Sequence, residues 1–164
     1  MFIELEPIFN NIGQQFTFEY PLDLSAFDYN CVFPFKVPVM VKGAVKNTAG
    51  VVELSADVNV VYDGFCDRCA EEVKERFYYS FSHTLVSTLN NEENDELMLI
   101  EDMHFDLDSL ITEDIFLSLP TKILCSEHCK GLCPKCGANL NKGKCDCKKE
   151  IDPRLAALTQ LLEN

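Results

Sequence analysis

Nine cysteines, most of them in closely spaced pairs, are the residues of this chain whose types and spacing could do chemistry. Two pairs have C-x-x-C spacing, which lets both sulfurs face one tetrahedral metal ion at about 2.3 Å and leaves backbone N–H groups to bond the thiolates. A single such pair also occurs in redox proteins. Two of them, together with two further cysteine pairs, favour metal binding. The eight candidate ligands are Cys66, Cys69, Cys125, Cys129, Cys133, Cys136, Cys145 and Cys147.

Eight thiolate ligands make two four-cysteine sites, so the sequence predicts two zinc ions. The simplest pairing joins the four most C-terminal cysteines in one short loop, similar to a shortened zinc ribbon. The other four then tie a hairpin tip to a segment that follows a helix. In that site His128 could replace Cys125, and the sequence leaves both options open. Cys31 is left over in an apolar stretch, where we expect a buried small hydrophobic side chain.

The N-terminal residues, Met1 to Glu6, carry acids where a signal peptide needs a basic stretch followed by an apolar one. No segment approaches the roughly 18 uninterrupted apolar residues of a membrane-spanning helix. We therefore expect a cytoplasmic protein without a membrane partner. In that reducing compartment the cysteines are expected to be metal ligands, in preference to disulfides or the accessible, low-pKa thiols of a redox sensor.

The formal net charge of -13 argues against a surface that attracts nucleic acid everywhere. The charge is uneven, however, because residues 91–115 contain ten acids and no Lys or Arg, whereas residues 122–149 contain seven Lys and two acids. These lysines could contact RNA phosphates, or they could offset the formal -2 charge of a zinc ion held by four thiolates. The candidate RNA contacts are Lys130, Lys135, Lys142 and Lys144.

Catalytic chemistry has little support in the sequence. A catalytic zinc keeps an open coordination position and usually has His or carboxylate ligands, whereas here the ligands suffice for two closed sites. The chain has no nucleophile elbow, phosphate-binding loop or dinucleotide fingerprint. We therefore expect a protein that is not an enzyme and has no small-molecule substrate.

The first two-thirds of the chain have the pattern of β-structure. Apolar residues alternate over 52–62 and again over 77–85, which predicts two strands that pair as an antiparallel hairpin with residues 64–69 at its tip. Residues 33–45 are also β-prone. Pro34 and Pro38 within that run suggest an edge strand. A turn is expected at 46–50 and a further strand at 16–20.

Helices are expected later in the chain. One should run from Ser109 to Leu119, with Asp108 as its cap and Pro120 as its stop. The acidic stretch 90–96 is expected to be a solvated loop. A last helix should begin at Asp152-Pro153, and its apolar stripe packs on its own domain or, alternatively, on a partner. The stripe consists of Leu155, Leu158, Leu161 and Leu162.

These elements predict an α+β fold. Residues 1–120 should form a β-rich domain, built on an antiparallel sheet or a partly open barrel, with the C-x-x-C hairpin tip and one short helix. Residues 121–164 should form a zinc-ribbon-like, cysteine-rich segment and the C-terminal helix, packed on the same domain.

Several motifs resemble those of the YceD family, the large-subunit ribosomal RNA accumulation proteins. They are Cys66-Asp67-Arg68-Cys69 after a β-run, residues 114–120 (DIFLSLP), residues 126–129 (SEHC), residues 130–141 (KGLCPKCGANLN), Cys145-Asp146-Cys147 and residues 151–155 (IDPRL). The likeness covers roughly residues 40–162 and corresponds to the family's longer, cysteine-rich form.

The resemblance implies a non-enzymatic factor in ribosome biogenesis that supports normal levels of large-subunit rRNA. Its expected partners are that rRNA or early ribosomal proteins of the large subunit. Some members lack the second cysteine group, so the shared role should not depend on it. An adaptor that binds only proteins is the alternative that the acidic composition keeps open.

Overall fold

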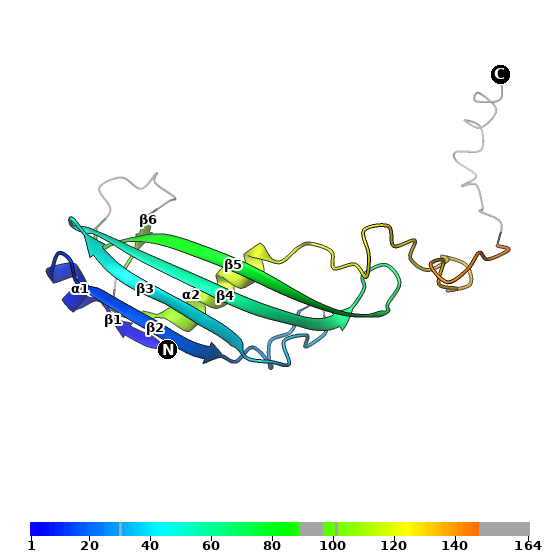
Figure 1. Cartoon of the computed structure of the whole chain (residues 1–164), viewed down its shortest axis with the longest axis horizontal. Helices are drawn as coiled ribbons and strands as arrows, with labels where there is room; N and C mark the ends of the chain where they lie inside the picture. The colour runs from blue at the N-terminus through cyan, green and yellow to red at the C-terminus, as the bar shows by residue number, and fades with distance from the viewer. Residues whose placement is uncertain (30, 89–96, 101, 148–164) are drawn as a thin grey trace, which may run out of the picture.

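A computed structural model describes residues 1–29, 31–88, 97–100 and 102–147 (Figure 1). A five-stranded sheet has the order β2-β3-β4-β5-β6, and a two-stranded sheet pairs β1 with β7. The strands are β1 (Phe2–Glu4), β2 (Gln15–Leu22), β3 (Val39–Thr48), β4 (Val51–Phe65), β5 (Glu72–Val86), β6 (Leu97–Leu99) and β7 (His104–Asp106), and the helices are α1 (Glu6–Asn10) and α2 (Leu107–Ser118).

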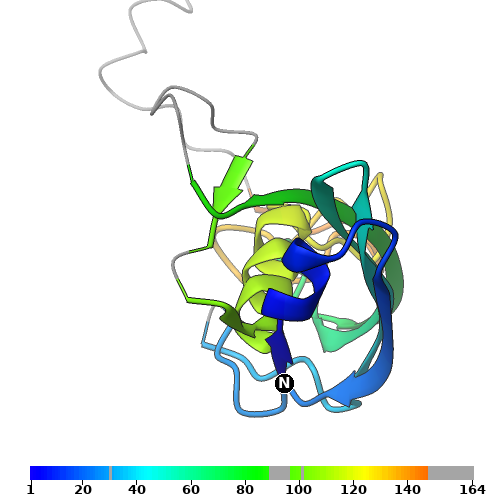
Figure 2. The ribbon, with the colours of Figure 1, turned by 90° about the vertical axis from the view of Figure 1, so that its left-hand side faces the viewer.

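The main sheet curls into a half-barrel around α2, as the view along the molecule shows (Figure 2). Its strands are antiparallel neighbours except β5 and β6, which pair in parallel. One face of β4 is buried at every second residue from Val52 to Tyr62. The buried side chains of α2, Leu107, Leu110, Ile111 and Ile115, join the same core. This arrangement confirms the α+β class and the partly open barrel.

The β4–β5 hairpin is longer than the alternation alone predicted. Its antiparallel pairing, which the sequence predicted, runs from Val52 opposite Leu85 to Phe65 opposite Glu72. β4 continues past residue 62 and β5 begins before residue 77, because cross-strand hydrogen bonds and partly buried side chains such as Val73 extend the pairing. The hairpin therefore carries its tip well beyond the core, and the cysteine-rich segment lies beside that tip (Figure 1).

The prediction that residues 33–45 form an edge strand was wrong. Pro34 and Pro38 precede β3, which begins at Val39 and lies between β2 and β4. The prolines therefore occupy the connection before the strand and remove no ladder hydrogen bond. The predicted strand at 16–20 is part of β2, which is an edge strand. The turn predicted at 46–50 is confined to Ala49 and Gly50, because β3 continues to Thr48.

The predicted helix is present as α2, but it begins earlier than expected. Its N-cap is Asp106, whose carboxylate accepts a hydrogen bond from the Asp108 N–H at 3.2 Å. Asp108 thus lies in the first turn and does not cap the helix. Burial of Leu107 against the sheet explains the earlier start. The predicted loop at 90–96 and the helix predicted from Asp152 lie outside the described residues.

Within the described residues, no helix has the length and apolar character needed to cross a membrane. The division of the chain at residue 120 stays a prediction. The segment after α2 continues along the hairpin tip and forms hydrogen bonds with it.

Candidate metal centre

The first C-x-x-C pair forms the tip of the β4–β5 hairpin. Cys66 follows β4 in the same alternation that buries Val60 and Tyr62, so its side chain points toward the inner face and is buried. The Cys66 N–H donates to the Glu71 carbonyl at 2.8 Å, and the Ala70 N–H donates to the Cys66 carbonyl at 2.9 Å. Ala70 has a φ of 56°, a left-handed conformation that closes the turn.

Residues 123–129 run beside this tip and bring two more cysteines to it. The Asp67 N–H donates to the Ile123 carbonyl at 2.9 Å, and the Ile123 N–H donates to the Asp67 carboxylate at 2.6 Å. Arg68 donates from Nη1 to the Cys129 carbonyl at 3.0 Å. Because Ile123 is itself buried in the main core, packing and two hydrogen bonds fix this end of the segment, and the Arg68 bond fixes the other end.

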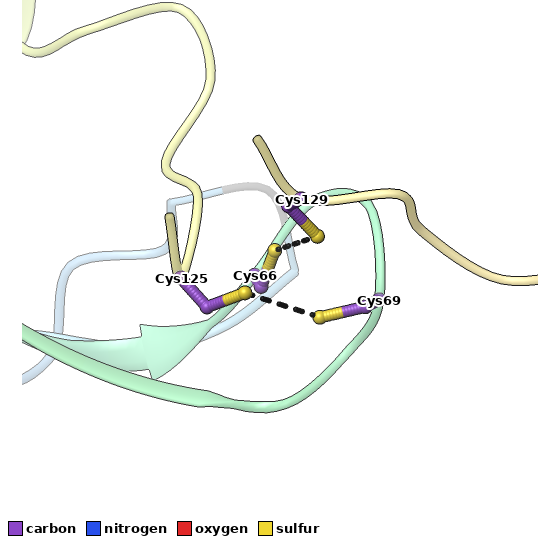
Figure 3. A group of neighbouring side chains, drawn as sticks. All are labelled: Cys66, Cys69, Cys125 and Cys129. Atoms are coloured by element: carbon purple, nitrogen blue, oxygen red, sulfur yellow. Dashed lines mark hydrogen bonds between the residues drawn. The ribbon is translucent and has the colours of Figure 1, made fainter. Parts of the chain in front are cut away.

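Four sulfurs converge there, from Cys66, Cys69, Cys125 and Cys129 (Figure 3). All four lie within 4.8 Å of one another, with 3.8 Å between the first and the last and 3.5 Å between the middle two. Ligands at about 2.3 Å from a tetrahedral ion are about 3.8 Å apart. A disulfide would need about 2.05 Å. The geometry therefore fits a four-thiolate metal site, with Cys125 in the position for which His128 was the alternative.

The thiols of this group have strongly unequal acidities. Burial, the largest influence, raises the pKa of Cys66, but N–H groups of Cys125, Arg68 and Cys69 together outweigh it and lower that pKa to about 6. For Cys69 the largest influence, a hydrogen bond from the Glu71 N–H, lowers the pKa. Burial and hydrogen bonds with the other three sulfurs raise it to about 12. Four sulfurs this close cannot all ionise without a cation between them, so the donor set fits zinc.

The second C-x-x-C pair folds into the same turn as the first. The Cys133 N–H donates to the Ala138 carbonyl at 2.8 Å, and the Gly137 N–H donates to the Cys133 carbonyl at 2.9 Å. The same two bonds, at the same offsets, close the first turn. Gly137 has a φ of 70°, which glycine adopts without the steric penalty that Ala70 bears at the equivalent position.

The sulfurs of Cys133, Cys136, Cys145 and Cys147 form a second group within 4.8 Å, as the sequence pairing predicted. This group is more exposed than the first, because only Cys133 is buried. N–H groups of Cys136 and Lys135 lower the pKa of Cys133 to about 6. A hydrogen bond with Cys136, followed by burial, raises the pKa of Cys147 to about 12. A second four-thiolate metal site therefore fits here as well.

The two groups are joined by contacts that the sequence did not indicate. Asn141 belongs to the loop of residues 133–147, here called the second loop. It donates from Nδ2 to the sulfur of Cys129 at 3.2 Å, and its Oδ1 accepts the Lys130 N–H at 2.7 Å. The Leu132 N–H donates to the Arg68 carbonyl at 3.1 Å. The second loop thus supplies part of the surroundings of the first site. Asn141 is the last residue of the family-like motif 130–141, but neither periodicity nor cysteine spacing indicates its role, since that role depends on a contact between two loops.

The four candidate RNA lysines have different surroundings. Lys142 forms an ion pair with Glu71 at 2.6 Å, and this pair raises the pKa of the Lys142 ammonium. Lys130, Lys135 and Lys144 are exposed around the second group. No ion pair involves Lys130 or Lys144 among the residues whose placement is described. RNA contact stays a prediction for all four, and Lys142 also docks the second loop on the hairpin tip.

The prediction that Cys31 is a buried small hydrophobe was wrong. Cys31 is exposed and belongs to neither sulfur group. Its φ of 63° places it in a tight surface turn, in which the Tyr29 N–H donates to the Val32 carbonyl at 2.8 Å and the Cys31 N–H donates to Asp28. The apolar neighbours in sequence suggested burial, but the turn directs this side chain outward.

Asn141→Ala is expected to weaken metal retention by the first site about 10- to 100-fold, the usual effect of removing a hydrogen bond to a metal ligand. Competition with a chromophoric chelator measures the change. A smaller effect is expected of Asn139→Ala, since Asn139 accepts the Asn141 N–H and bonds Glu71, but no contact among the described residues joins it to a sulfur of the first site. Equal effects of the two substitutions would show that loop shape matters and the hydrogen bond to sulfur does not.

Comparison with known proteins places the chain in a family. Residues 54–162 match the family model described as Large ribosomal RNA subunit accumulation protein YceD. The chloroplastic protein of that name, YCED homolog 1 of Arabidopsis thaliana, is 30% identical over 148 residues, covering 72% of this chain and 46% of the plant protein. Its Zea mays counterpart is 28% identical over 145 residues, covering 69% of this chain and 50% of that protein.

A bacterial relative, the uncharacterized protein YlbN of Bacillus subtilis, is 34% identical over 94 residues, covering 56% of this chain and 52% of YlbN. The chain spans about half the length of these curated relatives. No solved structure matches it. Because the family model matches more than half of the residues, and the matched range includes both sulfur groups, the chain belongs to the YceD family.

Proposed function

We propose that this protein is a non-enzymatic, zinc-binding factor in ribosome biogenesis that supports accumulation of large-subunit rRNA by contacting that RNA. The observation that carries the proposal is the family match, which runs through both cysteine groups. The cytoplasm, a reducing compartment, suits a protein whose thiols serve as metal ligands.

The donor sets support a structural role for the metal. Each group offers four thiols to one ion, so zinc bound there has no open position for substrate or water. Zinc has no redox chemistry of its own, and its closed four-cysteine sites typically hold loops in place. In this chain the loops that would be held are the hairpin tip and residues 129–147, which carry the basic part of the surface.

Lys130 and Lys144 are the best candidates for phosphate contact, and Lys135 lies in the same exposed segment. They surround the second sulfur group and lie within the segment where lysines outnumber acids. Lys142 is a weaker candidate, because its ammonium group is already paired with Glu71. The acidic remainder of the protein would repel RNA, so contact should be confined to this end of the molecule.

Lys130→Gln/Lys144→Gln is expected to weaken binding to large-subunit rRNA and to flatten its salt dependence. Each lost phosphate contact should lower the slope of log K against log salt by about one unit. Binding is measured by filter retention at several salt concentrations. The control is Lys42→Gln/Lys46→Gln, the same charge change on exposed positions of β3, one of which, Lys42, also loses its ion pair with Glu19. An unchanged slope in the first variant, or equal changes in both, would contradict phosphate contact.

A second candidate function is an adaptor that binds only proteins, and the net charge of -13 is the observation that favours it. Crosslinking in cells followed by sequencing of attached RNA separates the two. Enrichment of one region of large-subunit rRNA supports the proposal, whereas crosslinks to proteins alone support the adaptor.

A further inference from the structure

Among the described residues, the outer edge of β5 is unpaired over most of its length. On one side β5 pairs with β4 from Glu72 to Leu85, but on the other side β6 pairs only with Thr84–Val86. In the part of the chain that the structure describes, no strand therefore covers residues 72–83 on the outer side. In an antiparallel pair, every second residue of such an edge points its N–H and C=O away from the neighbour.

The free edge lacks the devices that normally block strand addition. Lys74 and Arg76 protect its end near the hairpin tip, but residues 77–83 (FYYSFSH) include no Pro and no Lys, Arg, Asp or Glu. The opposite edge of the sheet differs, because β2 contains Pro21, which has no N–H to donate, and Glu19 paired with Lys42. Of the two edges, β5 is thus the one open to pairing.

The inner face of this edge offers an apolar row. The rings of Phe77, Tyr79 and Phe81 stack in sequence with centroids 6.0 Å apart at each step, and all three are only half-buried. Alternate apolar side chains of an added strand would lie against the row and complete its burial.

The charged groups nearest residues 77–83 are carboxylates, although Lys42 and Lys46 of β3 lie one strand further in, opposite Asp57 and Glu53. On the outer face, Ser80 donates to Asp57 at 2.5 Å and Ser82 donates to Glu53 at 2.9 Å, which places both carboxylates one strand in from the edge. Neighbouring strands lie about 4.8 Å apart, so an added strand would lie about 10 Å from β4, the strand that carries both carboxylates. A Lys or Arg side chain of the added strand can reach them. On the inner side, Asp114 of α2 bonds His83 at 2.7 Å.

We propose that the edge of β5 from Phe77 to His83 binds an extended segment of a basic protein, with alternating apolar and basic side chains, as an added β-strand. A second copy of this chain fits less well because each copy carries a net charge of -13. RNA fits less well because Asp57 and Glu53 would face its phosphates. This site requires neither the zinc groups nor the lysines around them, so it can fail or hold independently of the proposed function.

The test uses the full chain and a synthetic ten-residue peptide of alternating Lys and Val as the probe. Amide hydrogen exchange should slow at least about tenfold at alternate residues of 77–83 when the peptide is saturating. Ser80→Lys/Ser82→Lys, which adds positive charge on the exposed face of the edge, should weaken binding at least about tenfold. Gln15→Lys/Thr17→Lys, the matched change on the exposed face of β2, should alter binding less than about twofold.

Four results would overturn the proposal. Equal weakening in both double variants, or equal binding of a Lys-Ser peptide, would show attraction by net charge alone. Self-association in sedimentation, with β5 protected in the absence of peptide, would identify a second copy as the occupant. Protection of residues 77–83 by an rRNA fragment and not by the peptide would identify RNA. Circular dichroism of both double variants verifies that their folds are intact.

Discussion

Cys66→Ser is expected to unfold much of the protein, whereas Cys136→Ser is expected to disorder only the loop of residues 133–147. Cys66 is 3% exposed, and its site joins the β4–β5 hairpin to a segment about sixty residues later in the chain. Loss of one ligand removes the metal from that long-range link and leaves three closely packed thiols without it. A ligand present at a thousand times its Kd contributes about 4 kcal/mol, which is the expected order of the loss.

The second group should behave differently because it closes a local loop and is mostly exposed. Cys136→Ser leaves the β-sheet and its core untouched, although loss of the Asn141 and Lys142 contacts should loosen the first site slightly. Guanidinium unfolding followed by circular dichroism, together with hydrogen exchange in β4 and β5, measures both effects. Cys31→Ser, outside both groups, is the control and should change stability by less than about 0.5 kcal/mol. The reverse ranking of Cys66→Ser and Cys136→Ser would show that the local loop supports the fold.

Two zinc ions per chain are expected, with a single thiol available to reagents before the metal is removed. The eight clustered sulfurs should be protected as zinc thiolates, whereas Cys31 is exposed in its surface turn and should react at once. Native mass spectrometry counts the metal, and titration with a thiol reagent before and after chelator counts the sulfurs. The expected counts are one reactive thiol without chelator and nine with it.

Zinc release during chelation should occur in two stages. The second group should lose its ion first, because only Cys133 among its ligands is buried, while three of the four ligands are buried in the first. One zinc per chain would show that one of the groups is not a metal site. No zinc, accompanied by disulfides, would instead support a thiol redox sensor.

The contacts between the two groups bear on how the lysines are tested. Lys142 lies against Glu71 at the hairpin tip, so its replacement disturbs the docking of the second loop as well as the surface charge. Lys130 and Lys144 have no such pairing among the described residues and report on phosphate contact more directly. The structure thus distinguishes Lys142, which docks the second loop, from Lys130 and Lys144, whose contact with RNA stays a prediction.

Local pattern was sufficient for several features of this protein. The alternation of apolar residues over 52–62 and 77–85 predicted the central hairpin, since a strand with one buried face has a period of two residues. The spacing of the cysteines predicted both sulfur groups and their pairing, because C-x-x-C turns have one compact geometry that brings two sulfurs together. In each case the signal lies within a few neighbouring residues.

Other features follow from contacts between distant residues and were decided only by the tertiary structure. The sequence could place prolines near β3 but could not show that β2 covers its outer side, which makes it an interior strand. Three other features also have no periodic pattern in the sequence. They are the turn that exposes Cys31, the hydrogen bond from Asn141 to the Cys129 sulfur and the free edge of β5. The sequence by itself determined which residues can hold metal and which strands form the hairpin, because those depend on local backbone geometry. Only the tertiary structure decided how buried each site is, what surrounds it and which edge stays open, because those depend on which segments pack together.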